Sequence, residues 1–248
     1  MPYKELNELV HQGLRAGHKR ILLKHVCGQR FIGAALTGTD VRLTIEGVPS
    51  NDLGIFMDGP TIVVKGNGED HVGNTMNDGL IVVHGHAGDV LGLLARGGKL
   101  FVKGDAGFRV GIHIKEYKGK KPTIVIGGCA KDYFGEYMAG GVLVALGLDL
   151  SEGRVKESTS SICGNCLGSG IHNGVIYLRC REVPSHLLGV GAKVVPFEED
   201  DRAALEPVVR EFADHFEVSA SDVMDAEFTK IVCEAKRPFR GNYCGTLV

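Results

Sequence analysis

A repeat of 19 residues runs through the middle of the chain and restricts what this sequence can fold into. Short apolar runs such as Thr61–Gly66, Leu80–Gly85 and Lys99–Gly104 each close on a glycine. Successive closing glycines are 19, 19, 19, 24 and 19 residues apart, and in five repeats a second glycine follows seven residues later. These structural glycines are Gly47, Gly54, Gly66, Gly73, Gly85, Gly92, Gly104, Gly111, Gly128, Gly135 and Gly147. A fixed period of this length indicates a solenoid.

Two columns of the repeat predict which side chains point inward. The residues two and four before each closing glycine, such as Val83 and Ile81, are apolar throughout. Alternate residues of a strand share one face, so both columns should line the interior. Each repeat is then two or three short strands separated by glycine corners, where a positive φ is cheap only for glycine. Neighbouring repeats should stack in register, about 4.8 Å apart.

The repeat therefore predicts an all-β solenoid, a single-stranded right-handed parallel β-helix of about six or seven turns with helices at both ends. Its handedness is expected from the strong preference of parallel crossovers. We expect three parts: an N-terminal capping helix within residues 1–20, the β-helix over residues 21–197, and a C-terminal helical extension and tail over residues 198–248. Apolar residues at helical spacing, such as Leu205 and Phe212, predict the C-terminal helix.

An apolar ridge is expected on the outer face of the strands, three residues before each closing glycine. The interface candidates on this ridge are Val63, Val82, Phe101, Val125 and Val144. A continuous apolar ridge is too large to stay wet on a soluble monomer. We expect the chain's own C-terminal helix to cover part of it. The alternative is that the ridge docks a partner subunit or a second copy.

Composition excludes several classes of function. The 28 basic and 30 acidic residues give a net charge of −2, so no electrostatic case exists for binding nucleic acid or an anionic membrane. The longest apolar run, Gly140 to Leu148, is far shorter than the roughly 20 residues of a membrane-spanning helix. The charged N-terminus and seven scattered cysteines favour a cytoplasmic protein with reduced thiols.

One polar column could carry chemistry. Four residues after the closing glycines stand Asn51, Asp70, Asp89, Phe108 and Asp132. Stacked carboxylates could bind a cation or act in catalysis. Asp and Asn also cap turns by accepting hydrogen bonds from backbone amides, and we favour this second interpretation.

The pair Cys163 and Cys166 forms the single CxxC motif, and these two thiols are the candidate metal ligands. Zinc or an iron–sulfur cluster would need two further ligands at a recognisable spacing. The remaining cysteines form no second CxxC, so we expect loop thiols rather than a metal site. The sequence predicts no catalytic and no cofactor-binding residue in this chain.

The glycine columns resemble those of the GXGXG family, the β-helical C-terminal domain of the glutamate synthase large subunit. The segments that carry the likeness are Cys27–Gly33, Gly104–Gly111, Glu136–Gly147 and Gly170–Tyr177, within roughly residues 20–195. The acidic helix and the segment from Glu227 make the chain similar to the stand-alone subunit found where that enzyme is split into separate polypeptides.

The resemblance implies a non-catalytic structural subunit of a split glutamate synthase, which makes two glutamates from glutamine, 2-oxoglutarate and two electrons. The implied partners are an amidotransferase subunit and an FMN-binding subunit, the latter also carrying an iron–sulfur cluster. The resemblance also leaves open whether the chain forms a homo-oligomer. The repeats also resemble the β-helical subunit of formylmethanofuran dehydrogenase, which uses the same coil and would be a scaffold of another complex. A β-helical carbohydrate-active enzyme is a third alternative, to which only the aspartate column points.

Overall fold

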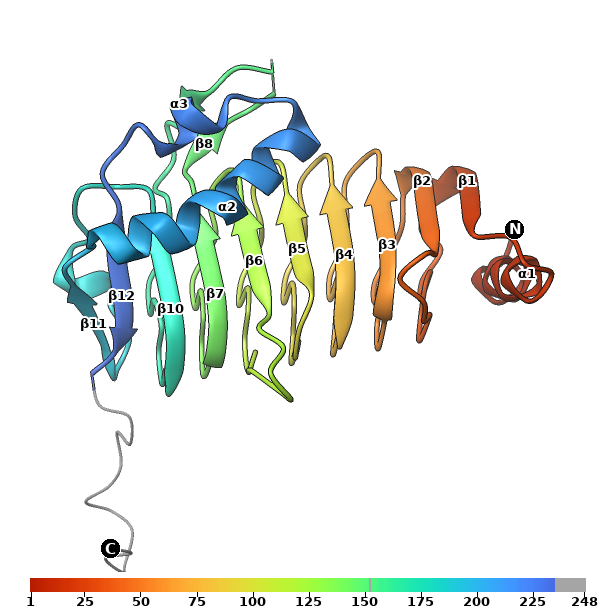
Figure 1. Ribbon diagram of the computed structural model, residues 1–248, viewed down its shortest axis with the longest axis horizontal. Coiled ribbons are helices and arrows are strands. Elements are labelled where there is room, and N and C mark those ends of the chain that lie inside the picture. The colour runs from red at the N-terminus through yellow and green to blue at the C-terminus, as the bar shows by residue number, and fades with distance from the viewer. Residues whose placement is uncertain (152, 235–248) are drawn as a thin grey trace, which may run out of the picture.

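The computed structural model describes residues 1–151 and 153–234, and it is a parallel β-solenoid of about six turns (Figure 1). The strands of its main sheet are β1 (Arg20–Cys27), β2 (Arg42–Val48), β3 (Asp58–Val64), β4 (Asp78–Val83), β5 (Lys99–Val102), β6 (Thr123–Ile126), β7 (Ala139–Ala145), β10 (Asn173–Leu178), β12 (Thr229–Cys233) and β11 (Ala192–Val195). The remaining elements are α1 (Tyr3–Arg15), β8 (Leu148–Asp149), β9 (Lys156–Glu157), the 3-10 helix η1 (Ser185–Leu187), α2 (Glu199–Phe216) and α3 (Ala220–Met224). The prediction of an all-β solenoid with a helix at each end is confirmed.

The stacking register predicted by the repeat is also observed. Strands β1 to β7 and β10 pair in parallel in chain order. Ile62 pairs with Ile81, Ile81 with Leu100, and Leu100 with Ile124, so like residues lie above one another. These side chains and those of the other inward columns form one buried core inside the coil. Leu91, the apolar residue before the second glycine of its repeat, is 1% exposed in this core.

Each turn differs from expectation in having one main strand where two or three were predicted. Beyond isolated bridges, the remainder of a turn consists of tight corners whose residues alternate between positive and negative φ. In the fourth turn Val90, Gly92 and Leu94 have φ of +61°, +72° and +56°. Their amides bond to carbonyls of neighbouring turns, so the corners are joined by a ladder although they are not strands.

A positive φ is found at two of the six closing glycines, Gly47 and Gly147, and the other four need glycine for a different physical reason from the one predicted. At Gly66 and Gly85 the backbone does not have a positive φ. A Cβ on Gly66 would lie 2.5 Å from the carbonyl oxygen of Gly47, and one on Gly85 would lie 2.1 Å from Oδ1 of Asn67. These positions need glycine because the previous turn approaches too closely for a side chain. A positive φ is found at the second glycines, for example Gly92.

A second core lies outside the sheet, under α2. Figure 1 shows α2 lying across the outer face of the strands. Leu205, Val209, Phe212 and Phe216 of α2 are at most 4% exposed and pack with the ridge residues. The five ridge residues Val63, Val82, Phe101, Val125 and Val144 are themselves 0–3% exposed. The ridge is therefore not a free docking surface: of the two covers expected, the chain's own helix is the one observed.

The position of α2 is set at its N-terminus and by β12. Glu198 and Asp201 form a capping box that satisfies free amides of the first turn. The carboxylate of Asp201 also accepts hydrogen bonds from the Tyr177 hydroxyl at 2.8 Å and from the Lys230 ammonium at 2.7 Å. Tyr177 belongs to β10 and Lys230 to β12, which pair antiparallel. One buried carboxylate thus joins α2 to two strands of the sheet.

The two ends of the coil are closed differently. At the N-terminal end, Val10 of α1 is 3% exposed, and Leu6 and Leu14 pack against the inner core. At the other end, β12 returns from the C-terminal helices and inserts antiparallel between β10 and β11. Among the described residues, no helix is both long and apolar enough to cross a bilayer.

Candidate functional site

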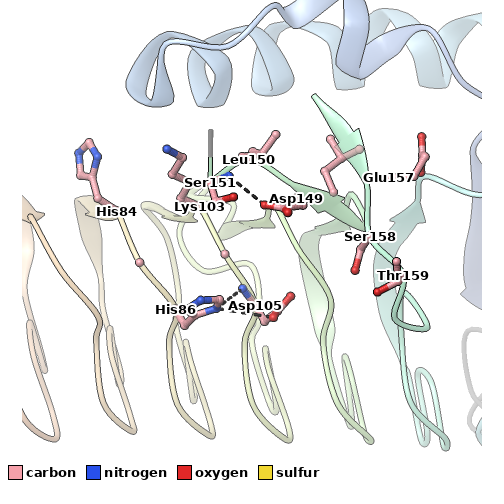
Figure 2. A pocket seen from close by; sticks show the side chains of 13 residues that line it. His84, His86, Lys103, Asp105, Asp149, Leu150, Ser151, Glu157, Ser158 and Thr159 are labelled. Carbon is pink, nitrogen blue, oxygen red and sulfur yellow. Dashed lines mark hydrogen bonds and ion pairs between the residues drawn. The ribbon is translucent and has the colours of Figure 1, made fainter. Parts of the chain in front are cut away.

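The insertion between β7 and β10 forms a groove of about 540 Å³ against one corner of the coil (Figure 2). The corner contributes His84, His86, Lys103 and Asp105, from two consecutive turns. The insertion contributes Leu148 to Ser151, including Asp149, and Glu157 to Thr159. The groove is created by long-range packing, because the insertion folds back onto turns that lie well before it in the sequence.

Charged groups of both signs face this groove. Burial, assisted by the charge of Lys65, lowers the pKa of His84 to about 4, so its imidazole is neutral at pH 7. Its Nε2 lies 2.8 Å from the Lys65 ammonium and can accept a hydrogen bond from it. Hydrogen bonds from Ser151 hold the pKa of Asp149 below its usual value. The groove suits a small polar ligand, and its mixed charge selects no particular class.

The two serines of the groove differ in their partners. The Ser151 hydroxyl bonds to the Asp149 carboxylate, which is a weak base because its pKa is lowered, whereas among the described residues no carboxylate or imidazole is a hydrogen-bond partner of Ser158. The Ser158 hydroxyl lies 3.5 Å from the Cys129 thiol, which donates to it, and burial raises the pKa of that thiol. Glu157 forms an ion pair with the buried Arg179. Nucleophilic catalysis needs a base within hydrogen-bond reach of the hydroxyl. In this arrangement the side chains hold the insertion against the coil.

The aspartate column caps backbone amides, but in the following turn and not in its own. Oδ1 of Asp70 accepts from the amide of Asp89 at 2.8 Å, and Oδ1 of Asp89 accepts from the amide of Phe108 at 2.9 Å. Oδ1 of Asp132 accepts from the amide of Asn165 at 2.8 Å. The carboxylates therefore connect one turn to the next, which the favoured turn interpretation did not foresee.

The two CxxC thiols lie in different surroundings. Cys163 is 3% exposed in the inner core, and burial raises the pKa of its thiol, with smaller effects from Cys180 and Cys129. Cys166 is half-buried, and its hydrogen bond with Tyr133 raises the pKa of that phenol. Over residues 1–151 and 153–234, no three His, Cys, Asp or Glu side chains are arranged to hold a metal ion. The seventh cysteine, Cys244, lies outside the described residues.

Comparison with known proteins agrees with the glycine pattern of the coil. The GXGXG motif family matches residues 18–235, which is most of the chain. The chain belongs to the GXGXG motif family. It is also 47% identical over 253 residues to the uncharacterized protein MJ1350 of Methanocaldococcus jannaschii, an alignment that covers 100% of this chain and 95% of the relative.

The GXGXG turns also present one side that carries no helix of the described chain, which we call the corner face. From the turn after β2 onward, it consists of residues with φ between +51° and +65° in two columns. Phe31 and Ala35 of the preceding turn have a similar φ, but Phe31 contacts Tyr3 of α1. The first column is Asp52, His71, Val90, Arg109, Tyr133 and Cys166. The second column is Phe56, Thr75, Leu94, His113 and Tyr137. Between them lie half-buried apolar residues such as Leu93 and Ile112.

The corner face is continuous across the turns. The His113 and Tyr137 rings stack with centroids 5.2 Å apart, and the Arg109 guanidinium lies 4.4 Å from the centre of the Tyr133 ring. Arg109 also pairs with the buried carboxylate of Glu136. Sequence reasoning missed this face because non-glycine residues disfavour a positive φ, so nothing marked these positions as corners. The signal available was the 19-residue recurrence of Phe56, Leu94 and their equivalents.

Proposed function

We propose that this chain is the non-catalytic structural and assembly subunit of a split glutamate synthase. The observation that carries the proposal is the match to the GXGXG motif family over residues 18–235. The family domain accounts for nearly the whole chain, and the likeness of its segments is to the β-helical domain of the glutamate synthase large subunit. The proposed partners are separate amidotransferase and FMN-binding subunits.

In this role the chain contributes shape and rigidity. The amidotransferase hydrolyses glutamine, and the FMN-binding subunit with its iron–sulfur cluster supplies two electrons to join the released ammonia to 2-oxoglutarate. Two glutamates result. A solenoid in which every turn is bonded to the next keeps the surfaces that it presents at fixed separations. Turns about 4.8 Å apart give the coil a length of roughly 30 Å, enough to contact two subunits at once.

Reconstitution tests the proposal. The chain would be purified alone and together with the amidotransferase and FMN-binding polypeptides encoded in the same genome. We expect no glutaminase and no glutamate formation from the chain alone. We expect a stable complex of the three polypeptides, whose glutamate formation from glutamine falls when this chain is omitted.

Two results would overturn this assignment. One is turnover by the chain alone that persists after further purification. The other is a fully active two-subunit enzyme that neither binds the chain nor gains from its addition. Stable association with formylmethanofuran dehydrogenase subunits instead would assign the chain to that alternative scaffold.

A further inference from the structure

The corner face exposes large apolar side chains that nothing in the described chain covers. Phe56 is 52% exposed, Leu94 41% and Tyr137 44%. With roughly 200 Å² of surface per large side chain, these three alone leave on the order of 250 Å² exposed. Half-buried neighbours such as Leu93 and Ile112 extend the apolar surface along the coil. The turn between Phe56 and Leu94 presents the polar residues His71, Asn74 and Thr75, so the exposed apolar side chains lie on either side of it. Apolar patches of this size also occur on monomers, so area alone does not identify a partner.

The charged residues Arg109 and Asp52 of the corner face each have a hydrogen-bond partner within the chain. Arg109 is paired with Glu136 and lies over the Tyr133 ring. The carboxylate of Asp52 accepts a hydrogen bond from the Asn74 side chain at 3.0 Å. An apolar surface whose charges are satisfied internally fits a protein surface of the same kind, and it offers nothing to a highly charged ligand.

The geometry points to a second copy of this chain as the occupant. We propose that two corner faces pack against each other with the coils antiparallel, on a two-fold axis through the turn that holds Leu94. Leu94 then faces Leu94 of the second copy. Successive turns on either side of this axis pair in reverse order, over the two turns on each side that extend from Phe56 to Tyr137.

The order of side chains along the second column suits this pairing. Two turns from the axis, Phe56 meets Tyr137 of the second copy, which places two exposed aromatic rings together. One turn from the axis, the exposed His113 meets Thr75, which is only 7% exposed. In the first column Tyr133 meets Asp52, so a phenol can donate to a carboxylate. A parallel arrangement would instead set Phe56 against Asp52. A histidine meets Arg109 in either arrangement, His71 in the antiparallel one and His113 in the parallel one.

The area and the rigidity of the face are sufficient. With the half-buried neighbours included, each copy would bury on the order of 500 Å², giving about 1,000 Å² in total, the lower limit for a specific interface. The backbone of the face is held by hydrogen bonds from its amides to carbonyl oxygens of the next turn. Examples run from the Leu94 amide to the Ile112 carbonyl at 3.1 Å and from the Tyr137 amide to the Ser169 carbonyl at 2.8 Å. Ordering this surface on association costs little, because it is already ordered.

Sedimentation velocity of the isolated chain over a wide concentration range tests the proposal. We expect a species of twice the chain's 26.5 kDa, and we expect Leu94→Lys to convert it to a monomer with unchanged thermal unfolding of the subunit. The matched control is Leu22→Lys, at a residue that is 50% exposed on β1 and away from the corner face, and it should remain dimeric. Phe56→Lys and Tyr137→Glu should each weaken the dimer, and the double variant should restore it.

Each other result contradicts the proposal. A monomer at every concentration overturns it, as does a dimer that survives Leu94→Lys. Failure of the double variant to restore the dimer overturns the antiparallel arrangement. If the chain is monomeric and Leu94→Lys abolishes assembly with the proposed glutamate synthase subunits, the face belongs to a partner subunit instead. The assignment to glutamate synthase is tested separately, because the isolated chain suffices here.

Discussion

At the scale of single residues, two features specify the solenoid. At some positions the neighbouring turn leaves no room for a side chain, and at others a non-glycine residue is held at an unfavourable positive φ. A non-glycine residue with positive φ costs about 1 kcal/mol or more, yet these residues recur at every turn of the corner face. The cost is tolerated because their amides, such as that of Val90, bond to the next turn. At Gly66 the opposite holds: φ is ordinary, but the preceding turn excludes a Cβ.

Alanine substitution separates close approach from conformational freedom. Gly66→Ala would place a Cβ 2.5 Å from the backbone oxygen of Gly47, and the clash can be relieved only by separating two turns. We expect a loss of about 2 kcal/mol or more in the free energy of unfolding, measured with urea. The control is Gly13→Ala in α1, where the nearest atom would be 3.6 Å away, and here we expect a gain of about 0.5–1 kcal/mol. Equal stability of Gly66→Ala and wild type would contradict the close-approach explanation.

At the scale of elements, α2 closes the outer face of the sheet, and its N-terminus is held by Asp201. Burial tends to raise the pKa of this carboxyl, but hydrogen bonds from Lys230, the Glu198 amide and Tyr177 outweigh burial and keep the pKa below its ordinary value of 3.8. Because the folded pKa is the lower one, the ionised carboxylate stabilises the fold at neutral pH. This contribution is lost as the pH falls below 3.8 and through the folded pKa.

Asp201→Asn tests this contact. Removing the charge leaves Lys230 without its partner in a largely buried position, so we expect a loss of about 1–3 kcal/mol at pH 7. The difference from wild type should narrow as the pH is lowered below 3.8, as measured by denaturant unfolding over a pH series. Asp200→Asn is the control, since Asp200 is an exposed residue of the same helical turn and its loss should change stability little. A difference that does not change with pH would show that charge is not what Asp201 contributes.

At the scale of the whole molecule, the solenoid is a row of turns that contact only their neighbours, with α2 as a brace along one side. A turn in the middle has a neighbour on each side, whereas β1 pairs only with β2. In Figure 1, α2 spans the strands toward the C-terminal end and leaves β1 and β2 uncovered. Local stability in such a structure depends on how many neighbours a turn has.

Hydrogen exchange measured by mass spectrometry should therefore show a gradient along the coil. We expect the amides of β5, β6 and β7 to exchange most slowly and those of β1 to exchange first. Phe212→Ala removes a buried ring of α2 that lies 5.9 Å from the Phe101 ring, so it should speed exchange in β5 while leaving β1 unchanged. Uniform protection from β1 to β7 would mean that the coil opens as one unit.

The sequence by itself determined the coil, its register and its inward columns, because one local pattern is repeated and each copy supports the others. Ile62, Ile81 and Leu100 align in sequence as they stack in space. It also predicted the C-terminal helix and the ridge that this helix covers.

Only the tertiary structure decided which outer surface stays open. The ridge is apolar throughout, and the corner face mixes apolar with polar residues. A helix that follows the last turn is not tied to either face by local sequence, and the tertiary structure shows α2 packed on the ridge. The groove beside Lys103 depends likewise on an insertion folding back over distant turns. The corners themselves were hidden, because residues such as Val90 and Tyr133 disfavour a positive φ in isolation and adopt it only when the neighbouring turn bonds their amides.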